Sequence, residues 1–222
     1  MFETFCLFYR IYSERYMKKI TLLFLVLITS ILSSQNIKFD TLITTKAYKS
    51  YYSKADLGPA IVTYTIFKAG GDCSRDTFAF FNDIKTLKTA TNKDYAKSGY
   101  DKGHMANSED FAYDCGLDEV TFRYYNCVPQ DPKLNRGPWK AYESKIRNLS
   151  YTDSLFVICY NHFSDKKLNE RVSIPDTCYK FVYTLSDKRL VISIAYTNDK
   201  KPVRSVPSDS ILVNVKKTIK FK

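Results

Sequence analysis

Two short stretches decide how this chain is interpreted: SGYDKGHM at residues 98–105 and NCVPQDPKLNRGPWKAYE at residues 126–143. The first holds His104, one of only two histidines in the chain, between glycines and charged residues that let the backbone turn sharply. A neutral imidazole with an ordinary pKa of about 6.5 is the natural base for taking a proton from water near neutral pH. Taken alone, a histidine in a polar loop is more often structural or simply solvated, so the second stretch has to decide between these interpretations.

The second stretch ends in a segment with helical periodicity. Its apolar residues recur every three or four positions and so share one face: Trp139, Tyr142, Ile146 and Leu149. Pro138 is acceptable in the first turn of such a helix. Trp139 is therefore expected to pack this helix against the core.

The rest of the chain favours strands. Runs rich in β-branched and aromatic residues predict strands at 60–68, 122–128, 154–160, 179–184 and 189–197. The end, 213–222, reads as an extended segment whose lysines share one side: Lys216, Lys220 and Lys222. These lysines would form a basic groove wall or, as we favour, protect an edge strand. Many strands, few helices and no βαβ alternation predict one α+β domain.

The composition fits one globular domain with a strongly basic balance. Of 222 residues, 45% are hydrophobic and 26% are charged, which excludes a disordered or fibrous chain. The formal net charge is +11. A charge of this size attracts polyanions, of which nucleic acid is the commonest, while solubility alone is the simpler alternative.

Residues 1–34 are predicted to be an export signal. From Met17 the chain reads MKKITLLFLVLITSILSSQ, with two lysines, an apolar run over 20–32 and small residues up to Ser34. We expect a true start at Met17, cleavage near Ser34, and a mature domain of 35–222 that is secreted or periplasmic. An uncleaved anchor is the alternative. No second long apolar run follows, so no transmembrane helix is predicted.

Export permits disulfides, and five cysteines follow the signal: Cys73, Cys115, Cys127, Cys159 and Cys178. Five thiols cannot all pair, and the sequence leaves the pairing open. Cys73 and Cys115 both lie in loops rich in glycine and aspartate, so they are our first choice for a bridge. Cys159 lies in the apolar run LFVICY and is predicted to be a buried thiol. The chain has no CxxC motif to support a zinc ribbon.

The two opening stretches together resemble the DNA/RNA non-specific endonucleases, whose site is called ββα-metal or His-Me finger. That family has an Asp-Arg-Gly-His box, then Asn-x-x-Pro-Gln, then Leu-Asn-x-Gly-x-Trp, and a glutamate four residues beyond the tryptophan. This chain has, in the same order, DKGH at 101–104, NCVPQ at 126–130, LNRGPW at 134–139, and Glu143. The resemblance spans residues 59–181 and implies an α+β fold with a central antiparallel sheet flanked by helices.

The resemblance implies a role for each matching residue. His104 is the general base that activates water for attack on a phosphodiester. Asn135 is the side-chain ligand of one divalent ion, normally Mg²⁺ with Mn²⁺ as a substitute, whose other positions are mostly water. Glu143 lies about 12 Å further along the helix at ~1.5 Å per residue, which favours hydrogen bonds to the ion's waters over direct ligation. Asn126 either helps to shape the site or is a satisfied turn residue.

Three basic residues are expected to hold the substrate: Lys102, Arg75 and Arg136. Lys102 and Arg75 are also assigned to the catalytic set. Lys102 stands where the family usually has arginine, and it offers a phosphate a compact point charge instead of two parallel N–H groups. Arg75 is the best match to an upstream family arginine placed against the scissile phosphate, with a plain surface role as the alternative. His162 matches no motif and is expected to be structural.

The function implied by the resemblance is a secreted, Mg²⁺-dependent endonuclease that cuts DNA and RNA with little sequence preference and leaves 5′-phosphate ends. Its partners would be DNA and RNA, without stable membrane association after signal cleavage, and it would be a monomer or homodimer. One rival is a non-catalytic nucleic-acid-binding relative, although pure binding needs none of His104, Asn135 and Glu143. Another is a toxin domain delivered to competitors, which the plain export signal disfavours.

Overall fold

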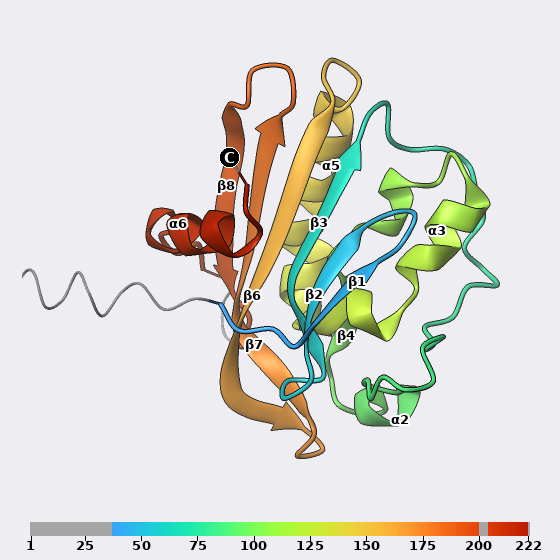
Figure 1. The fold of residues 1–222 in the computed structure, drawn as a ribbon. Coiled ribbons are helices and arrows are strands. Elements are labelled where there is room, and N and C mark those ends of the chain that lie inside the picture. Colours follow the sequence, from blue (N-terminus) through green and yellow to red (C-terminus); the bar gives the residue numbers. More distant parts are fainter. Residues whose placement is uncertain (1–36, 200–203, 222) are drawn as a thin grey trace, which may run out of the picture.

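The computed structural model describes residues 37–199 and 204–221, and its centre is one antiparallel sheet (Figure 1). Six strands lie in the order β1-β2-β3-β6-β7-β8, and each neighbouring pair is antiparallel. They are β1 (Thr41–Thr44), β2 (Lys49–Ser53), β3 (Gly58–Ile66), β6 (Leu155–Leu168), β7 (Val172–Thr184) and β8 (Leu190–Thr197). The predicted signal peptide, residues 1–34, lies outside the described residues.

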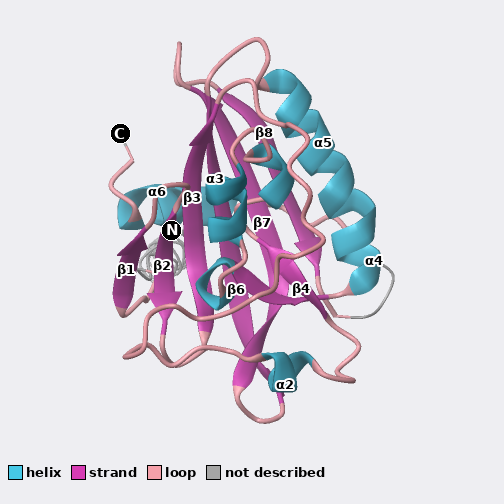
Figure 2. Cartoon of the chain, turned by 90° about the vertical axis from the view of Figure 1, so that its right-hand side faces the viewer, coloured by secondary structure: helices cyan, strands magenta, loops and turns pink. Residues whose placement is uncertain are grey.

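Each face of the sheet is covered by its own helix, because side chains on a strand alternate between two sides. α6 (Asp209–Thr218) packs on the face that carries Phe181. α5 (Lys140–Leu149) packs on the opposite face, where its Ile146 joins the cluster that contains Val182. Figure 2 shows the strands of the sheet between α6 on the left and α5 on the right. Within the described part of the chain, no helix has the length and apolar character needed to cross a membrane.

Most of the predicted elements are confirmed. The segments expected as strands at 60–68, 154–160, 179–184 and 189–197 coincide with β3, β6, β7 and β8, apart from one or two residues at the ends of three of them. The predicted helix is α5, and Trp139, at its start, is buried as expected. β6 and β7 extend beyond the predicted segments, because they continue as a long hairpin that contains polar residues. The sequence pattern of this part of the hairpin cannot be distinguished from that of a loop.

The strand predicted at 122–128 is wrong for most of its length. Phe122 ends the short helix α3 (Cys115–Thr121), and a single tight turn, η2 (Tyr124–Asn126), follows it. Only the last two residues of the segment belong to a strand, β5 (Cys127–Gln130). The aromatic residues that suggested a strand are buried in two separate hydrophobic clusters, so their spacing is that of a turn and not of a strand.

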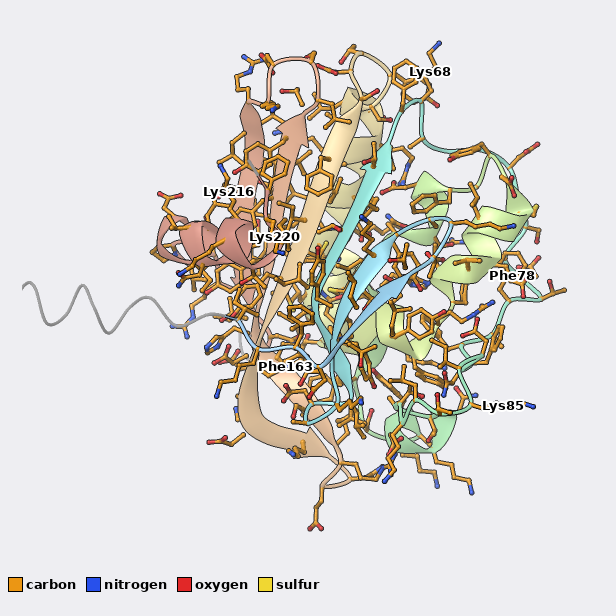
Figure 3. The ribbon with its side chains drawn as sticks, in the orientation of Figure 1. Lys68, Phe78, Lys85, Phe163, Lys216 and Lys220 are labelled. Atoms are coloured by element: carbon orange, nitrogen blue, oxygen red, sulfur yellow. A yellow bond between two sulfur atoms is a disulfide. The ribbon has the colours of Figure 1, made fainter. Side chains whose placement is uncertain are left out.

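The extended segment predicted at 213–222 is also wrong, because α6 occupies most of it. Its apolar residues have helical spacing and pack on the sheet: Ile211, Leu212, Val215 and Ile219. Lys216 does not guard an edge strand, since its Nζ lies 5.5 Å from the Phe221 ring over the face of the sheet. Figure 3 marks Lys216 and Lys220 in this region. Lys222 lies outside the described residues.

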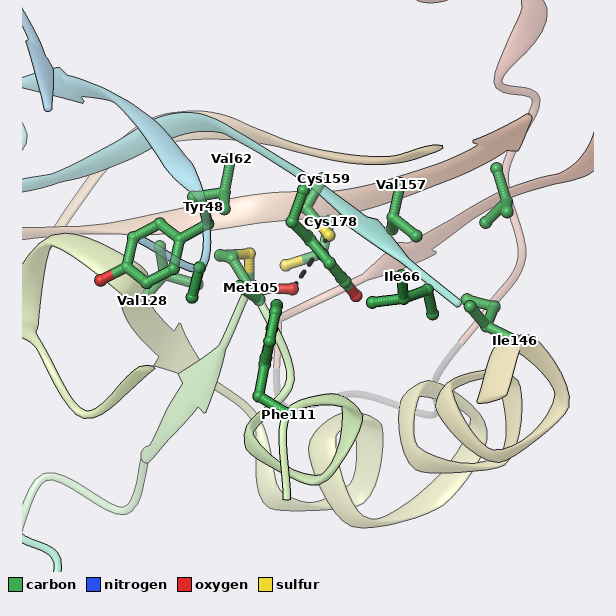
Figure 4. Close-up of a cluster of buried hydrophobic side chains, with 14 of the residues drawn as sticks. Tyr48, Val62, Ile66, Met105, Phe111, Val128, Ile146, Val157, Cys159 and Cys178 are labelled. Atoms are coloured by element: carbon green, nitrogen blue, oxygen red, sulfur yellow. Dashed lines mark hydrogen bonds between the residues drawn. The ribbon is translucent and has the colours of Figure 1, made fainter. Parts of the chain in front are cut away.

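The expected disulfide between Cys73 and Cys115 is confirmed, with an S–S distance of 2.03 Å. Cys159 is confirmed as a buried free thiol. Its Sγ donates to the Met105 carbonyl oxygen at 3.2 Å, inside the hydrophobic cluster drawn in Figure 4. Cys178, in the same cluster, is also a buried free thiol.

Candidate active site

The two opening stretches of sequence form a ββα unit beside the main sheet. β4 (Asp101–His104) pairs antiparallel with β5. The chain then continues through α4 (Pro132–Leu134) and the kinked segment η3 (Asn135–Trp139) into α5. The strands therefore position His104, and the first part of the helical segment positions Asn135. Gly137 has non-helical backbone angles (φ −105°, ψ −115°), so the kink lies between Asn135 and α5.

Gly103 is required by the close approach of β4 and β5. A Cβ at this position would lie 2.2 Å from Oε1 and 2.6 Å from Cβ of Gln130. The Gln130 side chain is fully buried, so it cannot swing away into solvent. The glycine of the sequence motif therefore has a packing reason as well as a position next to the histidine.

Gly103→Ala is expected to lower the free energy of unfolding by about 1–3 kcal/mol, because overpacking a well-filled site forces neighbouring atoms to move. Urea unfolding measures this change. Gly116→Ala is the matched control, since its Cβ would meet only Asp114 Oδ1 at 3.2 Å. Unchanged unfolding of Gly103→Ala would contradict the close packing of the two strands.

His104 is held between two aromatic rings. The centroids of Phe80 and Phe122 each lie 4.7 Å from that of the imidazole, with Phe122 edge-on. The residue as a whole is half-buried, but its Nε2 is buried and has no hydrogen-bond partner among the described residues. Nδ1 is therefore the ring nitrogen that can meet water. The two rings fix the direction in which it points.

The surroundings of His104 keep the imidazole neutral. Burial is the largest cause, and the positive charges of Arg75 and Lys102 add to it, so that the pKa of His104 is lowered to about 3. A neutral imidazole can accept a proton, whereas an imidazolium cannot. Across the physiological pH range this histidine is therefore ready to act as a base.

The lowered pKa of His104 predicts a pH-dependent stability difference between the wild type and His104→Gln. The unfolded imidazole takes up a proton below its ordinary pKa of 6.5, while the folded one stays neutral until about pH 3. Wild-type stability should therefore fall, relative to the glutamine variant, as pH drops from 7 to 4.5, by roughly 2.5 kcal/mol. Urea unfolding of both proteins at the two pH values measures it. A pH-independent difference would show that the imidazole titrates normally in the folded protein.

The two predicted cations near His104 are both held by polar partners. Lys102 Nζ donates to Asn92 Oδ1 at 2.7 Å and lies 5.3 Å from the centre of the Phe80 ring, which itself contacts the imidazole. Arg75 forms an ion pair with Glu109 at 3.0 Å, and both side chains are about two-fifths exposed. Both positive charges lower the His104 pKa, so the structure brings Lys102 and Arg75 to the predicted base.

Asp101 connects two of the predicted site residues, Asn135 and Arg136. Asn135 Nδ2 donates to Asp101 Oδ2 at 2.9 Å, and Arg136 donates to both Asp101 oxygens, at 2.9 and 2.7 Å. Burial raises the pKa of Asp101, but the hydrogen bonds from Arg136 and Asn135 outweigh it and hold the pKa below its ordinary value. Arg136, predicted to hold substrate, is therefore engaged by Asp101 while most of its side chain remains exposed.

Asn135 fits the role of a ligand for a hard divalent cation. A carboxylate only accepts hydrogen bonds, so the amide group that faces Asp101 must be the NH₂. The carbonyl oxygen Oδ1 then accepts no hydrogen bond from any residue in 37–199 or 204–221. In the same ranges no group of three or more His, Cys, Asp or Glu side chains could hold a metal ion. An ion bound at Oδ1 and otherwise by water would match the preference of Mg²⁺ for oxygen and for retained waters.

Glu143 lies in a buried charged cluster that sequence reasoning missed. Its Oε1 accepts from Lys180 Nζ at 3.2 Å, and Lys180, fully buried, also lies 4.3 Å from the Trp139 ring centre. Arg147 forms an ion pair at 2.7 Å with the buried Asp110. Burial, followed by the charge of Glu143, raises the pKa of Asp110 to about 7. Burial also raises the pKa of Glu143, against the opposing charge of Lys180.

Asn126 is fully engaged with the backbone. Its Nδ2 donates to the carbonyl oxygens of Ala106 and Thr121, and its Oδ1 accepts from the Ala106 N–H, at 2.8–2.9 Å. These contacts hold the segment that follows His104, so Asn126 acts on the site through the backbone. His162 lies apart from these residues on β6, with Nδ1 2.9 Å from Asp176.

Known proteins share parts of this sequence and its fold. Endonuclease G, mitochondrial, of Bos taurus is 33% identical over 91 residues, 40% of this chain and 30% of that protein. A nuclease of Nostoc sp. is 30% identical over 122 residues, 54% of this chain and 44% of that protein. The chain thus matches less than half the length of these curated relatives. A structure titled as the EndoG/EndoGI complex has a TM-score of 0.66 at 22% identity, over 85% of this chain and 89% of that one.

The structural likeness confirms the predicted α+β fold with a central antiparallel sheet flanked by helices. The sequence profile described as DNA/RNA non-specific endonuclease matches residues 32–222. This match covers most of the chain and contains every element of the ββα unit. The chain belongs to the DNA/RNA non-specific endonuclease family.

Proposed function

We propose that this protein is a metal-dependent endonuclease that hydrolyses phosphodiester bonds of DNA and RNA with little sequence preference. The observation that carries the proposal is the state of His104, a neutral imidazole held between two phenylalanines with Nδ1 open to water. The positive charges of Lys102 and Arg75 both act on His104, and we propose that they bind an anion beside it. Binding a nucleic acid would need these cations, but it would not need a neutral base next to them.

In the proposed reaction, His104 Nδ1 accepts a proton from water while the water oxygen bonds to phosphorus. The bond from phosphorus to the 3′ oxygen breaks, which leaves a 5′-phosphate, and the 3′ oxygen takes a proton from water to become a hydroxyl. A bound phosphate brings negative charge next to Lys102 and Arg75 and so reduces the field that lowers the pKa of His104. The imidazole is thus unprotonated before substrate arrives and becomes a stronger base when substrate is bound.

We assign the divalent ion to Asn135 Oδ1 and propose Mg²⁺, with Mn²⁺ as a substitute. When bound, the ion supplies positive charge that stabilises the phosphate and the leaving oxygen. Asp101 fixes the amide of Asn135, and Arg136 fixes Asp101. Glu143, oriented by Lys180, is proposed to accept hydrogen bonds from the waters around the ion.

Contacts to phosphates rather than to base edges account for low sequence preference and for activity on both polymers. Export is proposed from the apolar sequence that follows Met17. One disulfide among the described cysteines supports an oxidising compartment, either secreted or periplasmic.

Lys102→Arg is expected to keep or raise kcat/KM, because an arginine retains the charge and can donate two parallel N–H groups to a phosphate. Lys102→Met keeps the apolar stem without the charge and is expected to lower kcat/KM about tenfold or more. Steady-state cleavage of a labelled duplex at fixed salt measures both. A large loss in Lys102→Arg would mean that the ammonium, bound to Asn92, has a role that a guanidinium cannot take over.

Digestion of plasmid DNA and of RNA by the purified protein tests the proposed function. With Mg²⁺ present, both polymers should be cut internally, and EDTA should abolish the cutting. Binding of both polymers without cleavage, in Mg²⁺ and in Mn²⁺, would replace the enzyme by a nucleic-acid-binding protein.

A further inference from the structure

The segment that carries Arg75 has few apolar contacts of its own. It leaves the main sheet after β3 and rejoins the core at Phe78, which packs on Phe122, and at Phe80, which is buried against His104. Between Gly71 and Thr77, Cys73 alone is partly buried and the other residues are exposed. Hydrophobic packing therefore holds the segment only on the C-terminal side of Arg75, from Phe78 onward, and its N-terminal side needs another restraint.

Contacts with the chain around α3 fix the N-terminal side of this segment. The Cys73 N–H donates to the Ala112 carbonyl oxygen at 3.1 Å, and the disulfide joins Cys73 to Cys115, the first residue of α3. Gly71 passes so close that a Cβ there would lie 2.3 Å from the Ala112 carbonyl group, and its φ of +140° is one that other residues rarely adopt. The segment thus lies directly on the backbone that leads into α3.

Arg75 reaches the same part of the chain. It pairs with Glu109 at 3.0 Å, and its Nη1 lies 3.4 Å from Ser108 Oγ. An ion pair with both partners this exposed holds a side chain only weakly. The Arg75 carbonyl oxygen also accepts from the Phe78 N–H at 3.0 Å, which ties it to the part of the chain that follows. On the other side Cys73 is two residues away, so its covalent link to Cys115 is the strongest restraint there.

We propose that the disulfide between Cys73 and Cys115 positions Arg75 against the substrate phosphate, so that the grip on nucleic acid depends on the redox state of this one bond. The proposal rests on the nuclease function proposed above. In the oxidised protein Arg75 is held beside His104, and in the reduced protein the segment is free to move away. The enzyme would then work at full strength only in an oxidising compartment.

The bond can be reduced selectively. Cys115 is exposed and Cys73 is partly exposed, whereas the other described cysteines are buried thiols. Burial raises the pKa of Cys127 and of Cys159 to about 12, so neither forms the thiolate that exchange requires. A dithiol reductant gives two electrons and two protons to the bond, which becomes two thiols, while the reductant becomes a cyclic disulfide.

The test compares the wild type and Arg75→Ala, each oxidised and each treated with dithiothreitol. In the wild type, reduction should raise KM and lower kcat/KM by about three- to tenfold, the cost of ordering one long side chain anew. In Arg75→Ala, reduction should have almost no further effect. An equal loss in both proteins, or no loss in the wild type, would overturn the proposal. Cys73→Ala/Cys115→Ala should resemble the reduced wild type and not respond to the reductant.

Two further measurements separate a specific effect on Arg75 from other effects of reduction. Binding of a labelled DNA to His104→Ala, oxidised and reduced, reports on Arg75 even if the protein proves not to be a nuclease. Limited trypsin digestion shows whether reduction acts locally, because cleavage after Arg75 should accelerate while the rest of the chain stays protected. General digestion would mean that the disulfide serves the stability of the whole fold, which contradicts a specific positioning role.

Discussion

Replacing His104 by alanine is expected to lower kcat for DNA and RNA cleavage by about 10²–10⁴-fold, the usual contribution of a positioned general base. Nucleic-acid binding should be retained, because Lys102 and Arg75 keep their charges. The rings of Phe80 and Phe122 should keep their places around the smaller side chain. Single-turnover cleavage measures the chemical step, and fluorescence anisotropy measures binding.

His162→Ala is the matched control for His104→Ala. This second histidine is half exposed and pairs with Asp176 at the surface, so its loss should leave kcat within about twofold, as for most surface substitutions. If His104→Ala instead unfolded, or lost binding in proportion to activity, then His104 would be a structural histidine.

Asn135→Ala is expected to give the second largest loss. Removing the proposed side-chain ligand should lower cleavage at millimolar Mg²⁺ by at least about 100-fold, since even indirect ligand contacts contribute 10–100-fold to metal affinity. The Mg²⁺ concentration for half-maximal activity should rise. A Mg²⁺ titration of the single-turnover rate measures both effects.

Asn148→Ala provides the control on the same helical segment. Asn148 is an exposed asparagine on α5, and its replacement should leave the Mg²⁺ dependence unchanged. If Asn135→Ala kept the wild-type rate and the wild-type Mg²⁺ dependence, the ion would have to bind elsewhere.

The ββα unit can be predicted from the order and spacing of four short motifs, through their resemblance to a known family. Local patterns alone give less: the apolar face from Trp139 onward predicts the helix, while Gly103 and its polar neighbours place His104 in a loop. The structure instead places His104 at the end of β4, which pairs with β5. Local signals therefore identify the helix, and the resemblance is needed to single out His104 and Asn135.

The two wrong elements show where local signals fail. At 122–128 a turn carries the aromatic residues into two different hydrophobic clusters. Only tertiary packing distinguishes such a turn from a strand. In α6, valines alternate with polar residues over 213–215 as they would in a strand. The helix forms because Ile211, Val215 and Ile219 together cover an open face of the sheet.

The buried cluster around Glu143 could not be predicted, because its partners are far apart in the chain. Lys180 lies 37 residues from Glu143, and Arg147 lies 37 residues from Asp110. One signal was present, since Lys180 is a lone lysine inside a run of apolar residues predicted as a strand. A lysine in that setting is almost always paired when buried, but nothing local identifies the carboxylate that pairs with it.

The measurement that tests the central claim most directly is single-turnover cleavage by His104→Ala in Mg²⁺, with and without free imidazole. Removal of the ring leaves a space between Phe80 and Phe122, whose centroids were each 4.7 Å from it, so an added imidazole has a matching site. We expect a rate at least about 100-fold below that of the wild type, partly restored by imidazole in its neutral form. Cleavage by folded His104→Ala at the wild-type rate, with no response to imidazole, would contradict the assignment of His104 as the base.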